Sequence, residues 1–401
     1  MTPPTKTLPF PEFIGLLALL MATVAYSVDA MLPLLTLIGE DLAQGSMAQA
    51  QQVITVFMIG LGTGTFIMGP LSDRLGRKTV ILGGILLYMT AACIAATSQD
   101  ITMLLVARFI QGFGAAAPRV VSQALVRDLY SGRMMARVVS FSMTVFTLVP
   151  AIAPFMGAEL GALFSWRAIF WSFLVFGTVS GLWLFLRQPE TLSPENRRPL
   201  ALGSLWLALK TVLSHSLVRL YLLALTFVFT TMLSWISGVA AIFEQSFDRT
   251  AQFPAWFAFV AILSAPASLI NARLVVKVGM RRMVAIALTW QIGISLIALI
   301  GFQFPLGDWG FELFILFMLM QFFSIGFLIG NLHALVLEPM GHVAGMAASV
   351  VGGFSTVISA LLAAAAATFM NGTPVPLALS SLLCLLLASG CMIWARQLRE
   401  D

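Results

Sequence analysis

Long apolar runs separated by short polar stretches make up nearly the whole chain. A helix that crosses a bilayer needs about 20 consecutive apolar residues, and each of these runs is long enough. The pattern therefore predicts an all-α polytopic membrane protein with twelve transmembrane helices. The predicted spans cover residues 13–37, 50–71, 79–98, 102–125, 138–162, 168–187, 218–243, 252–272, 283–303, 311–336, 344–369 and 375–395.

Composition supports a membrane protein. Of the 401 residues, 59% are hydrophobic and only 10% are charged, with a mean hydropathy of +0.96. A soluble domain carries about 25% charged residues, so a soluble protein is excluded. No block of like charges indicates a nucleic-acid partner. The three cysteines lie in apolar runs without metal-ligand spacing, and neither a disulfide nor a metal site is expected.

The basic residues predict the orientation of the chain. Most of the 22 Lys and Arg residues fall in the segments that are cytoplasmic if both termini are cytoplasmic. The predicted outer loops carry only Arg167 and Arg249. Because positive charge is retained on the cytoplasmic side, we expect a multi-pass protein with both termini in the cytoplasm.

The chain is predicted to consist of two halves. Its longest connection, residues 188–217, is basic and contains prolines, and it separates an N-terminal half, 1–187, from a C-terminal half, 218–401. The stretch "SDRLGRK" after the second span has a weak counterpart, "VVKVGMR", after the eighth, with Val276 in the place of Asp73. Two similar six-helix halves are typical of transporters.

The stretch "GPLSDRLGRK", 69–78, forms the first short cytoplasmic loop. It resembles the signature loop of the major facilitator superfamily, and the matching positions include Gly69, Asp73, Arg74, Gly76 and Arg77. Glycine permits a tight turn at position 76, and Asp73 can cap a helix N-terminus. The resemblance implies two six-helix halves around a central cavity and a gating role for this loop.

A second acid is expected near the signature loop. Asp128 lies at the inner end of the fourth predicted span, which is close to this loop in the family fold. We therefore expect Asp128 to pair with Arg77 as part of a cytoplasmic latch.

Further stretches resemble one branch of that superfamily, the bicyclomycin and chloramphenicol resistance proteins, which are drug:proton antiporters. They are "ARFIQGFGAAA" in the fourth span, "PETL" at 189–192, "VDAMLPLL" and "LVRDLYSG". The fifth span resembles the antiporter motif through Pro150, Pro154 and Gly157, although Ala153 and Ala158 depart from its usual form. The resemblance implies a monomeric exporter in the bacterial inner membrane. It would use the proton gradient and no cofactor.

Two charged residues lie deep in predicted spans. Asp29 is about 12 Å from the outer end of span 1, and Arg108 is about 9 Å from the outer end of span 4. At matching depth they are expected to pair directly or through water. Arg108 favours the ionised carboxylate and burial favours the neutral acid, so Asp29 is a candidate for binding and releasing a proton. The alternative is a permanent structural pair in which Arg108 joins helices.

Arg119 lies eleven residues after Arg108. At 100° per residue the two share a helix face, together with Gln111. Arg119 either faces the cavity and meets an anionic group of the substrate, or extends to the cytoplasmic interface.

Other substrate-contact candidates are weaker. Their side chains are aromatic or amide groups within predicted spans, and packing or lipid contact is the alternative for each aromatic. They are Tyr26, Phe146, Phe229, Trp235 and Gln321.

The sequence thus favours a proton-coupled exporter of small amphipathic compounds that works by alternating access. The alternative is a dedicated exporter of an anionic or zwitterionic metabolite, such as a sugar, an amino-acid derivative or a siderophore-like acid. An enzyme or a non-transporting receptor is disfavoured, because the chain has no nucleotide-binding loop, nucleophile elbow or zinc motif.

Overall fold

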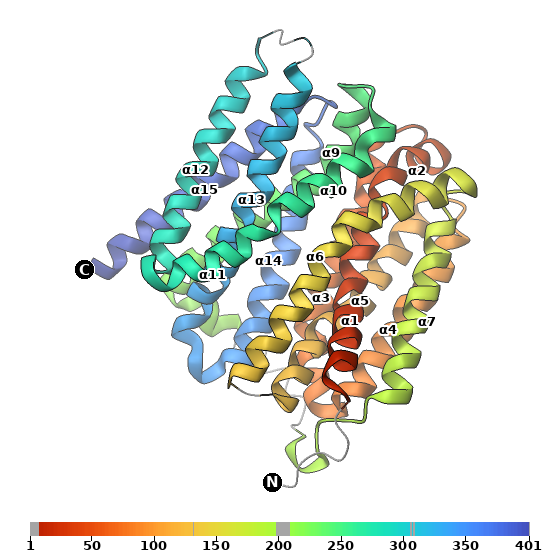
Figure 1. The fold of residues 1–401 in the computed structure, drawn as a ribbon, viewed down its shortest axis with the longest axis vertical. Coiled ribbons are helices and arrows are strands. Elements are labelled where there is room, and N and C mark those ends of the chain that lie inside the picture. The colour runs from red at the N-terminus through yellow and green to blue at the C-terminus, as the bar shows by residue number, and fades with distance from the viewer. Residues whose placement is uncertain (1–7, 131, 198–208, 305–306, 308, 401) are drawn as a thin grey trace. The chain divides into compact units, whose positions relative to one another are not determined.

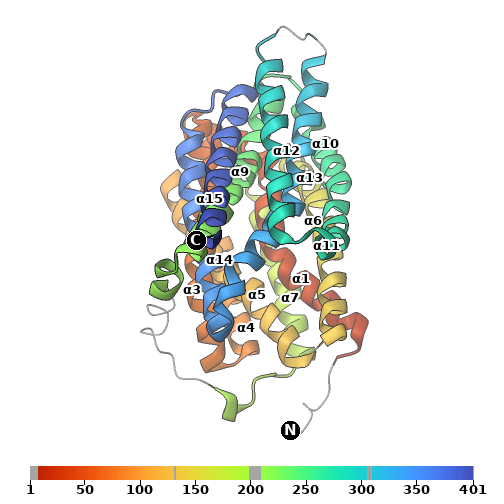
Figure 2. The same cartoon turned by 90° about the vertical axis from the view of Figure 1, so that its left-hand side faces the viewer.

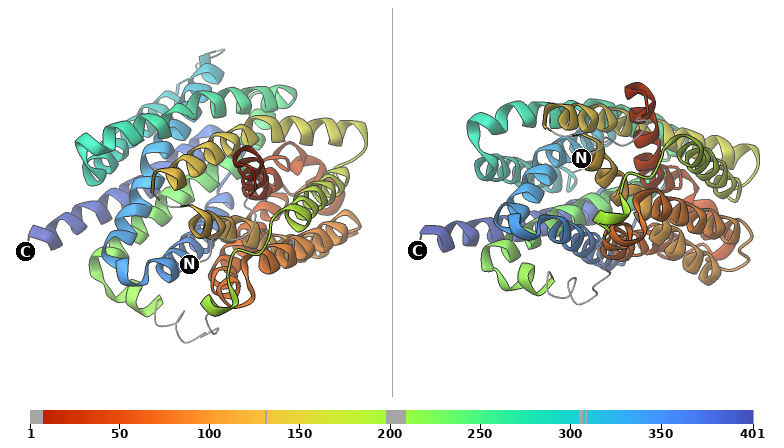
Figure 3. Two further views of the ribbon diagram at one scale, coloured as in Figure 1. Left: turned by 60° about the horizontal axis from the view of Figure 1, so that its bottom comes forward. Right: turned by 90° about the horizontal axis from the view of Figure 1, so that it is seen from below.

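The structure is a computed structural model that describes residues 8–130, 132–197, 209–304, 307 and 309–400. Every regular element in this part of the chain is a helix (Figures 1, 2 and 3). The chain divides into two compact units, Met1–Leu205 and Trp206–Asp401, and the boundary falls inside the 188–217 connection. Each unit is described by itself below.

The N-terminal unit contains the α-helices of the first six spans. Its elements are α1 (Phe10–Asp29), the 3-10 turn η1 (Leu32–Leu34), α2 (Leu35–Leu42), α3 (Met47–Leu75), α4 (Arg77–Ala96), α5 (Ile101–Leu129), α6 (Gly132–Leu163), α7 (Ala168–Arg187) and the 3-10 turn η2 (Pro194–Asn196).

The C-terminal unit is also helical. Its elements are α9 (Ser216–Gln245), the 3-10 turn η3 (Thr250–Gln252), α10 (Phe253–Ser264), α11 (Pro266–Val278), α12 (Met280–Gly301), α13 (Trp309–Leu337), the 3-10 segment η4 (Glu338–Val343), α14 (Ala344–Ala367) and α15 (Pro374–Glu400).

These helices match the predicted membrane spans. Within the described residues, eleven segments are long and apolar enough to cross a membrane. A shorter apolar helix, Val149–Leu163, lies in α6 at the position of the fifth predicted span. The predicted all-helical polytopic fold is confirmed.

Two predicted spans are interrupted. Span 1 consists of α1, η1 and α2, and the break follows Asp29, with Pro33 in the turn. Span 8 consists of α10 and α11, which meet at Ala265 and Pro266. Proline has no backbone N–H to donate to the preceding turn, which favours a break at both places. The predicted spans 13–37 and 252–272 contain no such breaks, so both are findings of the structure.

The helices that carry the charged residues of the N-terminal unit pack very closely. A Cβ at Gly112 of α5 would overlap the backbone carbonyl of Phe57 in α3. Small residues at such contacts let membrane helices approach backbone to backbone. This close packing fixes the position of α5, and with it Arg108, against α3.

Candidate functional site

The site in the N-terminal unit is built around Arg108, whose side chain is fully buried. Its Nε donates a hydrogen bond of 3.2 Å to the carbonyl oxygen of Val53 in α3, and Nη1 donates one of 2.7 Å to Oε1 of Gln111. Nη2 donates one of 3.0 Å to the carbonyl oxygen of Ser27 in α1. The guanidinium also lies 4.3 Å from the ring centroid of Phe57, a cation–π distance. Arg108 therefore joins three helices.

The carbonyl of Ser27 accepts from Arg108 because α1 ends there. The N–H of Met31, which would bond to Ser27 in a continuous helix, bonds instead to the carbonyl of Val28 at 3.1 Å. The last carbonyls of a helix lack intrahelical donors and carry partial negative charge. The buried cation of Arg108 thus caps the interrupted first span.

Asp29 is the last residue of α1 and is 5% exposed. Its carboxyl group forms no hydrogen bond or ion pair with any residue that the structure describes. The predicted direct pair with Arg108 is therefore absent, because the guanidinium reaches the end of α1 through the Ser27 carbonyl instead. Arg108 does lie against the end of α1 that carries Asp29, and a pair linked through water stays a prediction.

The antiporter motif of span 5 contacts the same break. A Cβ at Gly157 of α6 would overlap the carbonyl oxygen of Ala30, the residue that follows Asp29, and would also approach the ring of Pro33. Pro150 and Pro154 lie in the same helix. The glycine of this motif therefore packs against the backbone next to Asp29.

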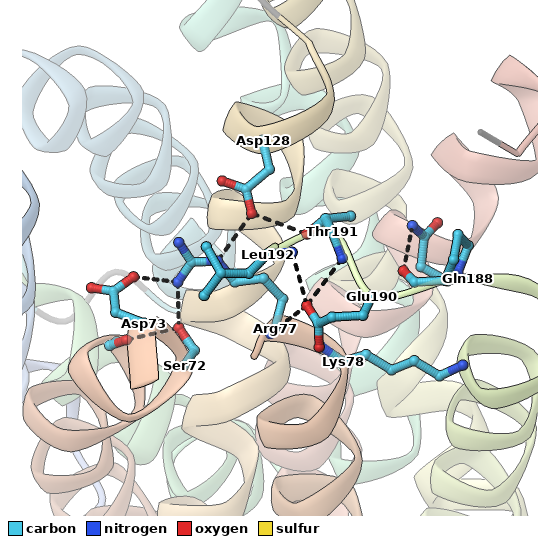
Figure 4. Close-up of polar contacts among 11 residues, drawn as sticks. Ser72, Asp73, Arg77, Lys78, Asp128, Gln188, Glu190, Thr191 and Leu192 are labelled. Atoms are coloured by element: carbon cyan, nitrogen blue, oxygen red, sulfur yellow. Dashed lines mark hydrogen bonds and ion pairs between the residues drawn. The ribbon is translucent and has the colours of Figure 1, made fainter. Parts of the chain in front are cut away.

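The signature loop forms a second polar cluster, centred on Arg77 (Figure 4). Arg77 forms ion pairs with Asp73 and with Asp128, whose Oδ2 lies 3.0 Å from Nε. Its Nη1 donates a hydrogen bond of 2.7 Å to Oγ of Ser72, which in turn donates to the carbonyl oxygen of Gly69 at 2.7 Å. The predicted Arg77–Asp128 pair is therefore present.

Asp73 and Arg74 of the signature loop differ in their surroundings. Asp73 does not cap a helix N-terminus, because α3 continues through it to Leu75 and its carboxylate pairs with Arg77. Arg74 is exposed and forms no ion pair with any residue that the structure describes.

The N-terminus of α4 is capped by Glu190 from the end of the unit (Figure 4). Its carboxylate accepts hydrogen bonds from the backbone N–H groups of Arg77 at 2.8 Å and Lys78 at 3.1 Å. It also accepts from the N–H groups of Thr191 and Leu192. A carboxylate at a helix N-terminus satisfies orphan donors and interacts favourably with the helix dipole.

Gly76 makes this capping possible. It has a φ of +105°, which disfavours L side chains, and a Cβ there would overlap the Glu190 carboxylate. Sequence reasoning missed the role of Glu190, since "PETL" served only as a family marker. The available signal was an acid placed after a helix end, together with a helix start at Arg77 that has no side-chain cap of its own.

Three predicted substrate-contact residues pack between helices of their own unit. The hydroxyl of Tyr26 hydrogen-bonds with Ser172 of α7 at 2.8 Å. Nε1 of Trp235 donates to Ser381 of α15 at 3.0 Å, and its ring stacks on Phe314. Each side chain thus already has partners in this structure, and its contact with a substrate stays a prediction.

Gln321 is the third of these residues. It is fully buried in α13, where its Nε2 donates to Oγ of Ser295 at 2.9 Å and its Oε1 accepts from Gln291, both in α12. Gln321 therefore takes part in a hydrogen-bond network between α12 and α13, and its contact with a substrate stays a prediction.

The remaining candidates stay predictions. Arg119 is partly exposed in α5 and forms no ion pair within the described residues. The ring of Phe229 lies edge-on to His333, with centroids 6.5 Å apart. The side chain of Phe146 lies outside the described part of the chain. No group of His, Cys, Asp and Glu among the described residues is arranged to hold a metal ion.

Comparison with known proteins identifies the family. The model described as Major Facilitator Superfamily matches residues 16–364. The chain belongs to the major facilitator superfamily. It is therefore a multi-pass membrane transporter of small molecules and not an enzyme.

The relatives include drug-resistance proteins. The chain is 29% identical over 373 residues to the bicyclomycin resistance protein homolog of Haemophilus influenzae, with 91% of each chain covered. It is 27% identical over 360 residues to multidrug resistance protein D of Escherichia coli, covering 88% of this chain and 87% of that protein. The predicted resemblance to this branch is confirmed.

A solved structure shares the fold. The crystal structure of the human organic anion transporter MFSD10 matches with a TM-score of 0.70 and 20% sequence identity, covering 97% of this chain and 99% of that one. At this identity the match supports the fold alone.

Proposed function

We propose that this major facilitator exports small amphipathic compounds in exchange for protons, and that Asp29 is the carboxyl that binds the proton. The observation that carries the proposal is a buried acid at a break in span 1 with no partner among the described residues. An ionisable residue within a membrane span marks a proton or substrate pathway by default. The relatives that are named for drug resistance favour export of such compounds.

The proposed cycle uses the chemistry of a single carboxyl group. A proton from the outer side neutralises Asp29 and displaces the substrate. The protein then opens inward, the proton leaves to the cytoplasm, and a new substrate molecule binds while Asp29 is ionised. Competition between proton and substrate for one site couples the two fluxes, since each species must leave before the other binds.

Orientation follows from the charges of the chain. We place both termini and the signature loop in the cytoplasm of a bacterial cell, with the protein acting as a monomer in the inner membrane. In this arrangement the cluster of Arg77, Asp73 and Asp128 is the cytoplasmic latch. Its ion pairs would hold α3, α4 and α5 together in one conformation of the cycle.

The test is transport driven by a pH gradient in everted membrane vesicles. Asp29→Asn is expected to abolish proton-driven accumulation of a fluorescent amphipathic cation, while Asp29→Glu retains part of it. Asp248→Asn is the matched control, because Asp248 is exposed and has a φ of +51°, which asparagine also adopts readily. Wild-type proton dependence in Asp29→Asn would show that another group carries the proton.

One observation favours the alternative of a dedicated exporter of an anionic or zwitterionic metabolite. Arg119 is a partly exposed cation inside a membrane helix, and no described acid pairs with it. Uptake of matched neutral, cationic and anionic compounds by wild type and Arg119→Gln separates the two functions. A selective loss of anion transport in the variant supports the metabolite exporter.

A further inference from the structure

The inner end of span 1 is held by the last turn of α7. Nε and Nη2 of Arg187, the last residue of α7, donate to the two carboxylate oxygens of Glu12 at 2.7 and 2.8 Å. Nε1 of Trp183 donates to the same carboxylate at 3.3 Å. Glu12 lies in the first turn of α1. A two-pronged arginine–carboxylate pair fixes orientation as well as distance.

The outer end of span 1 is held by Trp166 and Arg167, the two residues that precede α7. Nη1 of Arg167 donates to Oδ2 of Asp41 at 2.7 Å, and Nε1 of Trp166 donates to the same oxygen at 2.9 Å. Asp41 lies at the end of α2, and the Arg167 guanidinium stacks over the Trp166 ring at 4.2 Å. Arg167 also donates to the carbonyl oxygen of Ser98 at 3.0 Å.

Each end of span 1 therefore carries an acidic residue, Glu12 or Asp41. Its carboxylate accepts hydrogen bonds from one arginine and one tryptophan that lie in α7 or directly before it. The two helical elements differ in continuity. Helix α7 runs for 20 residues without interruption, whereas span 1 is broken just after Asp29. Between the two ends, Tyr26 bonds to Ser172 of α7 and packs on the rings of Phe173 and Phe176.

We propose that α7 is a splint for the broken first span, and that Arg167 and Arg187 are positioning residues that fix its two ends and confine rearrangement to residues 30–34. Asp29 would then change its surroundings while both ends of the span stay in place. The functional meaning of the splint rests on the proposed role of Asp29, but the contacts that define it do not.

The splint makes a specific prediction about coupling. Exposed ion pairs usually act independently, and mutations at distant sites usually have additive effects. Glu12 and Asp41 are roughly 40 Å apart along the helix path at about 1.5 Å per residue. If the Glu12–Arg187 and Asp41–Arg167 pairs both act on the same break, removing both changes the exchange rate there by a factor that differs from the product of the two single factors.

The experiment is a double-mutant cycle read by hydrogen exchange. Full-length protein in lipid nanodiscs is compared as wild type, Glu12→Gln, Asp41→Asn and the double variant, and exchange is followed for the backbone amides of residues 30–36. Each single variant is expected to exchange about two- to threefold faster. The double variant is expected to depart from the product of these factors by at least about threefold, and agreement with the product overturns the proposal.

A control pair lies in the C-terminal unit. Arg281 and Glu338 form an ion pair of 2.8 Å with similar side-chain exposure. Glu338→Gln should leave exchange at residues 30–36 unchanged and should combine with Glu12→Gln multiplicatively. Accelerated exchange there in Glu338→Gln would show that any lost ion pair loosens the protein, which overturns the splint.

Charge reversal separates a positioning role from general stability. Glu12→Arg combined with Arg187→Glu is expected to restore slow exchange that either single change loses. If the protein with the reversed pair does not fold, the Arg187→Lys variant is measured in its place. Its exchange rate at residues 30–36 is expected to lie between those of wild type and Glu12→Gln. No acceleration in Arg187→Lys, or no rescue by a folded reversed pair, overturns the proposal. This readout measures no transport of protons or substrate, so its outcome is independent of the transport assay on Asp29→Asn.

Discussion

Nη2 of Arg108 lies 3.0 Å from the carbonyl oxygen of Ser27, two residues before Asp29. A buried arginine in the membrane thus has backbone carbonyls and the π face of Phe57 around it, where the sequence had suggested a carboxylate. The carboxyl of Asp29 is consequently left without a fixed counter-charge among the described residues. This is the arrangement that a proton-exchanging acid requires, because a permanent ion pair would hold it ionised.

Arg108→Lys is expected to destabilise the protein by about 2 kcal/mol or more. Lysine keeps the charge but cannot reach Val53, Gln111 and Ser27 together, so buried acceptors lose their donors. Thermal unfolding in detergent measures the change. Arg219→Lys, at an exposed site in α9, is the matched control and should unfold like wild type. Equal melting temperatures for both variants would refute the capping role.

Gly157→Ala is expected to cost roughly 1–3 kcal/mol, the usual range for overpacking. The added methyl group would overlap the carbonyl of Ala30 and push α6 away from the break in span 1. The control is Gly390→Ala in α15, where a Cβ would meet nothing within 4 Å. An alanine there should be neutral or slightly stabilising, since alanine favours helix. Thermal unfolding compares the two variants, and equal tolerance would contradict the close contact.

Glu190→Ala is expected to loosen the first turn of α4. The backbone N–H groups of Arg77 and Lys78 lose their acceptor, and loss of such a cap costs about 1 kcal/mol. Hydrogen exchange at these two amides should become several-fold faster. The exposed Glu195, a few residues later, provides the control as Glu195→Ala. Unchanged protection of α4 in Glu190→Ala would mean that the cap contributes nothing.

Asp73→Asn and Asp128→Asn are expected to be non-additive. Arg77 is only 8% exposed, and its guanidinium pairs with both carboxylates, so either single change leaves it one counter-charge. The double change leaves a nearly buried cation without any, which costs about 3–5 kcal/mol in comparable cases. Melting temperatures of the four proteins give the coupling directly. If the loss of stability in the double variant equals the sum of the losses in the two single variants, the two carboxylates do not share Arg77 as a partner.

The sequence predicted the helices well because the bilayer imposes a length and a composition that any reader can recognise. The breaks in spans 1 and 8 could not be predicted from the sequence. Pro70 and Pro118 also lie inside spans, yet α3 and α5 continue through them. Whether a proline interrupts a span depends on whether another group donates to the backbone carbonyls that lose their helical partners. At span 1 that group is Arg108, which lies 81 residues after Ser27.

Side-chain direction was predicted less well than side-chain depth. Matching depths correctly predicted that Arg108 lies at the end of α1, and the family resemblance correctly predicted the Arg77–Asp128 pair. The substrate contacts of Tyr26, Trp235 and Gln321 stay predictions, since all three side chains are buried against neighbouring helices. In a helix that is apolar nearly all round, a 3.6-residue period does not distinguish a face that meets another helix from one that meets a cavity.

The Glu190 cap also sets an order of events during synthesis. The carboxylate and the Arg77 N–H that it accepts from are 113 residues apart in the chain. A ribosome that adds roughly 5–20 residues per second needs on the order of ten seconds to travel that distance. Through that interval the start of α4 is already made but has no acceptor. The hydrogen bonds at the start of α4 are therefore completed late, when the segment after α7 emerges.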